Sequence, residues 1–267
     1  MDLGLKGRVA AIMGGSAGIG KAIAAGLAGE GVNLVLMARD PDNLEGAANE
    51  ITDRWPVEVL AQPADNTKTE TVDAAAAAAA ERFGTVDILV NNAGHRMRRM
   101  DRQILWEDED WMSDVDAKTI GMLRTIRAFL PHLATGGTGR VINISGLAGW
   151  MVWEGAMTHG LNNAAMQHVG RYLARDLAEA NITVNTVVPG FVGVEWRRQL
   201  AKTIAEKNSM TVDEYLDGYI KDKGILAGRW AEPEEVADLT VFLASDRAAY
   251  INGASIAIDG GMSVNPR

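Results

Sequence analysis

The sequence predicts one α/β domain, built on a seven-stranded parallel sheet with helices on both faces in a doubly wound arrangement. Short apolar runs alternate with longer helical patterns along the chain, and a glycine-rich turn directly follows the first apolar run. No linker interrupts this alternation, and 267 residues of which 47% are hydrophobic can bury one large core. We therefore expect residues 1–267 to form a single domain.

Seven apolar runs are predicted to be the strands, because a strand buried on both faces is apolar without interruption. In chain order they are residues 8–13, 33–38, 57–61, 87–90, 140–144, 182–188 and 255–258. The alanine-rich tract at 73–84 predicts a packing helix before the fourth strand, since alanine is the strongest helix former and Gly84 can end the helix.

Residues 191–230 interrupt the alternation of strands and helices. They are rich in charge, with Trp196, Tyr215 and Tyr219 interleaved. A long excursion after a strand often covers an active site. We expect this region to act as a lid over a substrate.

Composition and charge exclude several functional classes. A net charge of −9 and a pI near 5.0 argue against binding to nucleic acid or to an anionic membrane surface. The chain has no cysteine, which excludes disulfides and thiol catalysis, and its histidines lack the spacing of metal ligands. No apolar run reaches the roughly 18 residues that span a bilayer, and the N-terminus lacks the layout of a signal peptide, so a cytoplasmic location is expected.

Residues 10–28 form a strand, a glycine turn and a helix, which is the arrangement that binds a dinucleotide. Gly14 permits the tight turn, while Gly18 and Gly20 let the backbone approach a pyrophosphate and let the helix pack closely. The free N–H groups of the helix N-terminus then bind the phosphates, with Ser16 expected to face them. The spacing is G-x-x-x-G-x-G rather than the usual G-x-G-x-x-G, so a purely structural turn is the alternative.

The end of the second predicted strand indicates which dinucleotide is bound. Arg39 occupies the position at which an arginine accommodates a 2′-phosphate, and Asp40 follows one residue later. This order predicts NADP(H). The alternative is NAD(H), with Arg39 and Asp40 forming an ordinary surface pair.

Four segments in the correct order resemble the short-chain dehydrogenase/reductase family: MGGSAGIG at 13–20, NNAG at 91–94, VNTVVPGFV at 184–192, and most of residues 228–261. The resemblance implies a Rossmann fold, an NAD(P)-dependent oxidoreductase that transfers a hydride, and a homotetramer or homodimer. It also implies the residues that bind the cofactor. They are Gly14, Ser16, Gly18, Ile19, Gly20, Arg39, Asp65, Asn66, Asn91, Ala93, Gly94, Asn163, Pro189, Gly190 and Val192.

The catalytic positions of this family are all replaced in the sequence. Gly146 falls on the family's serine, His159 on its tyrosine, Asn163 on its lysine, and Lys118 on its asparagine. Removal of one donor to a developing oxyanion costs on the order of 10²–10³ in rate. Ser145 does not replace the lost serine simply, because consecutive strand residues point to opposite faces.

The replacing residues can still carry chemistry, and we take His159, Lys118 and Asn163 as the candidate catalytic residues. His159 can accept a proton as neutral imidazole or donate one as imidazolium, or it can merely fill the old tyrosine pocket. Lys118 restores a positive charge beside it, unless it is a solvated lysine paired with Asp114. Asn163 retains an amide for the ribose hydroxyls or for a structural role.

Two further segments predict the chemistry of the substrate. The four arginines of HRMRRMDR at 95–102 suit an acidic substrate group, although a solvated or intersubunit loop that balances the acidic 106–111 is the alternative. Residues 150–153, with Phe191 and Trp196, can form an apolar, aromatic-accepting pocket at the end of the fifth strand, or can be ordinary core and interface packing.

Three functions are consistent with these residues. The first is an NADP(H)-dependent oxidoreductase acting on a small carbonyl or alcohol substrate, aromatic or acidic, with a non-standard active site. The second is a lyase, dehydratase or isomerase on the same fold, and the third is a non-catalytic NADP(H)-binding protein. The intact cofactor motifs favour the first, while the replaced catalytic positions raise the other two.

Overall fold

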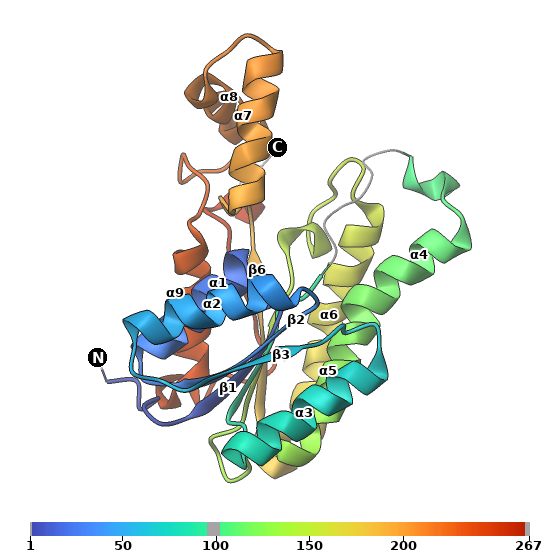
Figure 1. Cartoon of the computed structure of the whole chain (residues 1–267). Coiled ribbons are helices and arrows are strands. Elements are labelled where there is room, and N and C mark those ends of the chain that lie inside the picture. The colour runs from blue at the N-terminus through green and yellow to red at the C-terminus, as the bar shows by residue number, and fades with distance from the viewer. Residues whose placement is uncertain (1, 95–101, 265–267) are drawn as a thin grey trace.

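The computed structural model describes residues 2–94 and 102–264, and it confirms the predicted sheet. Seven parallel strands lie in the order β3-β2-β1-β4-β5-β6-β7, so the order of the strands reverses between β1 and β4. Figure 1 labels β1, β2, β3 and β6 of this sheet. The strands are β1 (Val9–Met13), β2 (Asn33–Ala38), β3 (Val59–Pro63), β4 (Ile88–Asn91), β5 (Arg140–Ile144), β6 (Thr183–Pro189) and β7 (Ser255–Ile258). Ligands bind at the carboxyl ends of the strands at such a switch point.

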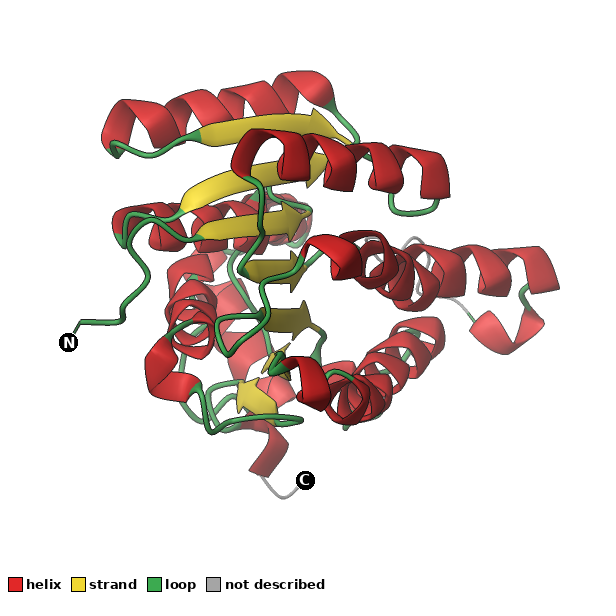
Figure 2. Ribbon diagram, turned by 90° about the horizontal axis from the view of Figure 1, so that it is seen from below, coloured by secondary structure: helices red, strands yellow, loops and turns green. Residues whose placement is uncertain are grey.

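Two layers of helices cover the sheet, one on each face (Figure 2). The α-helices are α1 (Gly18–Gly29), α2 (Pro41–Arg54), α3 (Thr69–Phe83), α4 (Asp108–Val115), α5 (Gly121–Phe129), α6 (Met157–Asp176), α7 (Glu195–Lys207), α8 (Val212–Lys223) and α9 (Pro233–Ala244). Helices α1, α2 and α9 pack on one face, and α3, α5 and α6 pack on the other (Figure 1). Among the described residues, none of these helices is long and apolar enough to cross a membrane.

The central strands are buried on both faces, which explains their uninterrupted apolar sequences. In β1, Ala10 and Ile12 point into the core under α1 and α9, whereas Val9, Ala11 and Met13 point into the core under α3 and α5. This alternation is the pleat of a strand. The arrangement holds the carboxyl ends of β1, β4, β5 and β6 at one rigid edge.

Two predicted elements differ from the structure by two residues or more. The third strand runs two residues later than predicted, because Val59 pairs with Leu34 while Val57 is held in a turn by the carbonyl of Trp55. Helix α3 begins at Thr69, before the alanine tract, and ends at Gly84, whose φ of 78° suits glycine. Both differences adjoin the β3–α3 connection, because β3 ends at Pro63 and α3 begins at Thr69, on either side of Asp65.

The predicted lid region forms a helical projection. Helices α7 and α8 rise from the carboxyl edge of β6, above the body of the domain (Figure 1). A separate apolar cluster, in which Phe191, Ile225 and Trp230 are buried, joins the base of this projection to the end of β6. The capping box of Thr211 and Glu214 fixes the start of α8.

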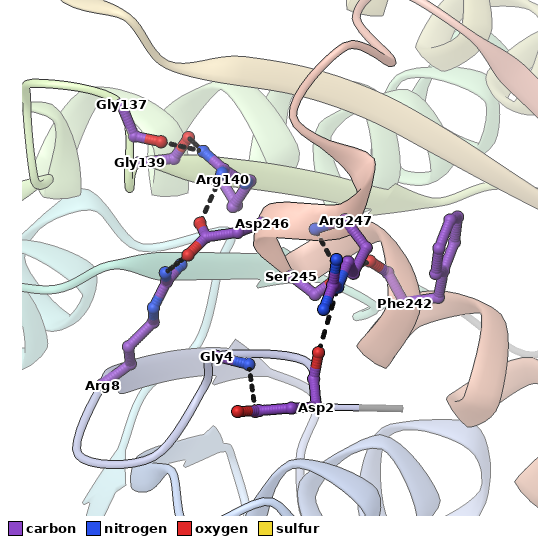
Figure 3. Close-up of polar contacts among 10 residues, drawn as sticks. All are labelled: Asp2, Gly4, Arg8, Gly137, Gly139, Arg140, Phe242, Ser245, Asp246 and Arg247. Carbon is purple, nitrogen blue, oxygen red and sulfur yellow. Dashed lines mark hydrogen bonds and ion pairs between the residues drawn. The ribbon is translucent and has the colours of Figure 1, made fainter.

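A charged cluster ties the strands together at the opposite, amino-terminal edge of the sheet (Figure 3). Asp246 accepts one hydrogen bond from Arg8 at 2.7 Å and a weaker one from Arg140 at 3.3 Å. The Arg140 side chain is 1% exposed and also donates to the carbonyls of Gly137 and Gly139. A buried guanidinium needs such partners, because desolvation of an unpaired charge is costly.

Asp246→Asn is therefore expected to destabilise the fold, because it removes the counter-charge of two arginines. We expect a loss of about 2 kcal/mol, which corresponds to a fall of about 5 °C in Tm for a domain of this size. Thermal unfolding followed by circular dichroism measures it. Asp238→Asn, which removes the same charge from an exposed position on α9, serves as the control, and an equal Tm for both variants would contradict the expectation.

Candidate cofactor and catalytic site

In the turn after β1, the backbone at Gly14 packs closely against the backbone at Gly20 and is held by Asn92. The amide of Gly14 donates to the carbonyl of Met37 at 2.7 Å, and the side-chain amide of Asn92 donates to the carbonyl of Gly14 at 3.0 Å. A Cβ on Gly20 would lie 1.9 Å from the oxygen of Gly14, so only glycine fits there. The NNAG segment thus holds the glycine turn in place.

The N-terminus of α1 is left open toward a ligand. Its N-cap residue, Ala17, has no side chain that can accept a hydrogen bond from the first turn. Ser16 is half-buried directly before this N-cap. Val194, at the start of α7, would be 3.3 Å from a Cβ on Gly18, so the base of the lid adjoins this turn. Uncapped N–H groups and the helix dipole together fit the pyrophosphate of a dinucleotide.

The end of β2 separates the roles of its two charged residues. Asp40 is the N-cap of α2, and its carboxylate accepts hydrogen bonds from the backbone and side chain of Asn43 at 3.1 and 2.7 Å. Arg39 is exposed and lies close enough to Asp65 to help lower the pKa of that carboxyl, against the opposing effect of burial. Asp40 is therefore occupied as a helix cap, and Arg39 is available to an anionic group.

Further residues implied to bind the cofactor lie at neighbouring strand ends. Asn91 and Asn143 face each other from β4 and β5, with the Asn91 amide donating to the Asn143 carbonyl oxygen at 2.9 Å. Asn66 is held by the backbone of Ala117 at 2.7 Å and lies directly after Asp65. These contacts fix the backbone that a nucleotide would meet along the carboxyl edge.

The remaining members of that set are spread around the same edge. Ile19 lies in the first turn of α1, Ala93 and Gly94 follow β4, Pro189 ends β6, and Gly190 and Val192 lie directly after it. A Cβ on Gly190 would meet Asp259 at 2.9 Å, so the backbone is close-packed there.

Lys118 reaches the carboxyl edge from a π-helical turn, Asp116–Ile120, between α4 and α5. Its Nζ donates to the Oδ1 atom of Asn163 on α6 at 2.6 Å, and its aliphatic chain passes over Gly94. The pairing of Lys118 with Asp114 is not formed, because Asp114 accepts a hydrogen bond from Thr158 at 2.8 Å. Isolated π turns inside helices are frequent at functional sites, since they re-aim one side chain.

Asn163 is fully buried and links the backbone of His159 to Lys118. Its Nδ2 donates to the backbone carbonyl of His159 at 2.9 Å, while its Oδ1 accepts from the lysine. A Cβ on Gly146 would lie 3.1 to 3.3 Å from the Asn163 side chain, which is a tight contact. The glycine in place of the family's serine therefore makes room for this asparagine.

Ser145 lies beneath the backbone of Asn163, and its hydroxyl donates to that carbonyl at 3.5 Å. Its hydroxyl accepts hydrogen bonds from Gln167 at 2.8 Å and from the backbone of Gly146 at 2.5 Å. The side chain is buried beneath α6. It does not supply the missing donor at the carboxyl edge.

His159 lies between two cations and against an aromatic wall. Its ring stacks on Trp153, with centroids 6.5 Å apart. Burial, followed by the positive charges of Lys118 and Arg197, lowers the pKa of His159 from 6.5 to about 3. The imidazole is therefore neutral at physiological pH, and the imidazolium donor that the sequence allowed is disfavoured.

Lys118 is the group in this cluster that titrates near neutrality. Burial alone lowers the pKa of its ammonium from 10.5 to about 8. A cation with this pKa is mostly protonated at neutral pH and releases its proton readily, as a general acid should. Within residues 2–94 and 102–264, no group of three potential ligands could hold a metal ion.

The predicted apolar pocket at 150–153 divides into two parts. Trp153 stacks on Phe191, with centroids 4.9 Å apart, and this pair adjoins His159. Val152, 98% exposed, and Trp150, 46% exposed, do not join this stack but line an open cavity together with Met151 and Trp153. Trp196, at 38% exposed, lies outside the aromatic stack and meets Arg197 instead.

This cavity, of about 700 Å³, has Trp153 in its lining, whereas Phe191 and His159 are not among the residues that line it. Residues 148–157 and the outward-facing Gly160, Leu161 and Ala164 of α6 line it, together with Arg102, Gln103 and Ile104. The arginine-rich segment that was predicted to bind an acidic group lies outside the described residues, apart from the exposed Arg102.

One residue of the site was missed at the level of sequence. Arg197 lies in the first turn of α7, with its guanidinium 5.1 Å from the Phe191 ring centroid, and its charge acts on His159. In the sequence, the only indication of its role is that a basic residue follows shortly after residues 184–192, the segment that includes the end of β6.

Comparisons with known proteins agree with this geometry. Residues 14–263 match the protein-family profile described as enoyl-(acyl carrier protein) reductase. The 3-oxoacyl-(acyl-carrier-protein) reductase FabG of Vibrio cholerae is 32% identical over 260 residues, covering 97% of this chain and 99% of that protein. The chain belongs to the short-chain dehydrogenase/reductase family. It is thus an NAD(P)-dependent oxidoreductase by family, as the resemblance implied.

Solved members of the short-chain dehydrogenase/reductase family superpose over the whole chain. L-Sorbose reductase from Gluconobacter frateurii, complexed with NADPH and L-sorbose, has a TM-score of 0.93 and 33% identity, with 100% of both chains covered. A short-chain oxidoreductase from Pseudomonas aeruginosa PAO1, described as containing an atypical catalytic center, has a TM-score of 0.90 and 28% identity, again over 100% of both chains.

Proposed function

We propose that this short-chain dehydrogenase/reductase is an NADPH-dependent carbonyl reductase in which Lys118 supplies the proton. The observation that carries the proposal is the hydrogen bond of 2.6 Å between Lys118 and Asn163. Relative to the family pattern, the lysine and the asparagine have exchanged places. An ammonium therefore still lies between the two segments that carry these residues. The amine is supplied from the π turn instead of from α6.

The preference for NADP(H) rests on the end of β2. Arg39 is exposed at the position that meets the 2′ group of the adenosine ribose, whereas Asp40 is occupied in capping α2. A guanidinium fits a 2′-phosphate, and a capping carboxylate is not free to bind a 2′-hydroxyl. The NADPH complex of L-sorbose reductase supports the same cofactor.

The chain's own residues would then act as follows. Bound NADPH supplies the hydride that reaches the carbonyl carbon. The Lys118 ammonium, held by Asn163, gives a proton to the carbonyl oxygen as the alcohol forms. His159, neutral and stacked on Trp153, donates a hydrogen bond from its ring N–H to the same oxygen and thereby takes over part of the oxyanion stabilisation lost at Gly146.

The charge of the site suits a developing alkoxide and a neutral, reduced nicotinamide. Lys118 and Arg197 both act on His159, so two cations lie near the place where an alkoxide would develop. They stabilise a developing negative charge, and they repel the positive charge of an oxidised nicotinamide. The Pseudomonas aeruginosa relative with an atypical catalytic center supports the idea that this fold accommodates a departure from the usual residues.

Transfer of a labelled hydride tests the proposal against the lyase and the non-catalytic alternatives. NADPH deuterated at the transferred position is incubated with the protein and a panel of ketones and aldehydes, and the products are analysed by mass spectrometry. Deuterium in the alcohol product is the expected result. Consumption of substrate without label would favour a lyase or isomerase, and NADPH binding without any product would favour a binding protein.

Arg39→Leu is expected to raise the KM for NADPH by about 10- to 100-fold, because it removes the charged partner of the 2′-phosphate. The KM for NADH, which lacks this phosphate, is the internal control and should stay the same. Initial rates with each cofactor at saturating carbonyl substrate measure the effect. An unchanged ratio of the two KM values would show that Arg39 does not select the cofactor.

A homodimer or homotetramer and a cytoplasmic location remain predictions for this protein. Several large apolar side chains of α4 and α6, among them Met112, Met157 and Leu161, are exposed in the single chain. Such a patch is typical of a contact surface.

A further inference from the structure

Arg197 is a largely buried cation that has no counter-ion in the described part of the chain. Its Nη1 atom is buried and makes no hydrogen bond there, and none of the described carboxylates pairs with it. Its guanidinium instead lies 5.1 Å from the ring of Phe191 and 5.2 Å from that of Trp196. Cation–π contacts compensate a desolvated charge only in part.

The groups around Arg197 do not neutralise it. Tyr219 is the neighbour that could neutralise Arg197 if its phenol were ionised. Burial, however, raises the pKa of this phenol well above its ordinary value, so the hydroxyl stays neutral. Arg198, the next residue, is by contrast fully engaged with Glu232 at 2.5 Å and with the carbonyl of Gly193 at 2.7 Å. Within the described residues, one of two adjacent arginines is thus paired and the other is not.

A second unpartnered donor lies on the same aromatic wall. The indole Nε1 of Trp153 is buried without a hydrogen-bond partner among the described residues. Trp153 stacks on both Phe191 and His159, and Arg197 contacts the same Phe191 ring, so the indole belongs to the wall that Arg197 shares. Buried donors are nearly always paired, so two orphaned donors at one wall indicate that the missing partner is a ligand.

The geometry points to a carboxylate on the substrate, bound by Arg197 and the indole N–H of Trp153 while its carbonyl lies at Lys118 and His159. This inference rests on the proposed function, since it assigns the substrate class of the same site. A carboxylate carries one negative charge and accepts several hydrogen bonds, which matches one guanidinium and one indole donor. The stacked rings of Trp153 and Phe191 fit the apolar segment between the two ends.

Paired acids and esters test the inference. Levulinate and 4-acetylbenzoate, each compared with its methyl ester, are assayed for kcat/KM with NADPH, because the ester retains the carbonyl and loses the charge. We expect Arg197→Gln to lower the preference for acid over ester by about 10- to 100-fold, the effect of one charge-assisted hydrogen bond. Arg197→Lys should recover part of it. Lys202→Gln, which removes an exposed charge from the same helix, is the matched control and should leave the preference unchanged.

Binding is measured separately from turnover, so that the two proposals can fail independently. Quenching of tryptophan fluorescence by each acid is followed with the NADPH-loaded protein and its Arg197→Gln variant, whose folding is checked by Tm. Turnover of esters and acids with equal efficiency in both proteins would overturn the carboxylate site and leave the reductase standing. Binding of acids that depends on Arg197, without turnover of any carbonyl, would support the site and overturn the reductase. Absence of binding and of acid preference would overturn the site.

Discussion

Lys118→Met is expected to lower kcat for carbonyl reduction by about 10²–10⁴-fold, the usual contribution of a general acid. Methionine has a similar length and no charge, so the substitution removes the proton donor without opening a large cavity. Initial rates of NADPH oxidation at saturating cofactor measure the effect. The binding of NADPH, followed by fluorescence, should change far less, because Arg39 and the N–H groups of the glycine turn, rather than Lys118, are the groups proposed to bind its phosphates.

The pH profile distinguishes a proton donor from a merely structural lysine. Reduction requires the protonated form, so kcat/KM should be constant at low pH and should fall as pH rises through the Lys118 pKa of about 8. In Lys118→Arg, whose guanidinium stays protonated, this fall should disappear from that range. An unaltered profile in the arginine variant would assign the titration to another group and remove Lys118 from the mechanism.

Exchanging the two residues provides a rescue experiment. The double variant Lys118→Asn with Asn163→Lys returns the ammonium to α6, the place that the family pattern gives it. We expect it to have at least ten-fold more activity than Lys118→Asn alone. The ammonium would then extend from α6 into nearly the same space that it reaches from the π turn in the parent protein. If the double variant is no better than the single one, the two positions are not equivalent, and the exchange of helices has no functional meaning.

The same exchange shows how far sequence could predict the site. The fold and the glycine turn were predictable because uninterrupted apolar strands and G-x-x-x-G-x-G are local patterns. Each of them is contained within a few consecutive residues. The β3 register was missed by two residues, since it depends on pairing of Val59 with Leu34 and on the turn at Trp55. Register is a property of two strands, which one run of sequence does not contain.

The chemistry of the site was less predictable for a similar reason. The positions of Lys118 and Asn163 could be assigned, but their contact spans 45 residues and requires the π turn at Asp116–Ile120. The space left by Gly146 also appears only when β5 and α6 are packed together. Burial and charge, which determine the protonation of His159, are likewise products of the tertiary structure.

His159→Phe is expected to lower kcat/KM for reduction by about 10²–10³-fold, the cost of one donor to the developing oxyanion. Phenylalanine preserves the stacking on Trp153 and removes only the ring nitrogens, so the shape of the pocket is retained. His159→Gln keeps an N–H donor and should retain more activity than the phenylalanine variant. Similar losses in the two variants would indicate that shape, rather than hydrogen bonding, is what His159 contributes.

The lowered pKa of His159 also predicts how the stability of the folded protein changes in acid. Its pKa is about 3 in the folded protein and near 6.5 when unfolded, so between these values the unfolded chain binds the extra proton. This residue therefore lowers stability as pH falls from about 6.5 toward 3, and the effect is absent above that window. His159→Phe should lose less Tm between pH 7 and pH 4.5 than the parent protein. An equal loss of Tm in both proteins would show that the imidazole protonates freely in the folded state. His159 could then donate the proton itself, and the main reason for naming Lys118 as the proton donor would be lost.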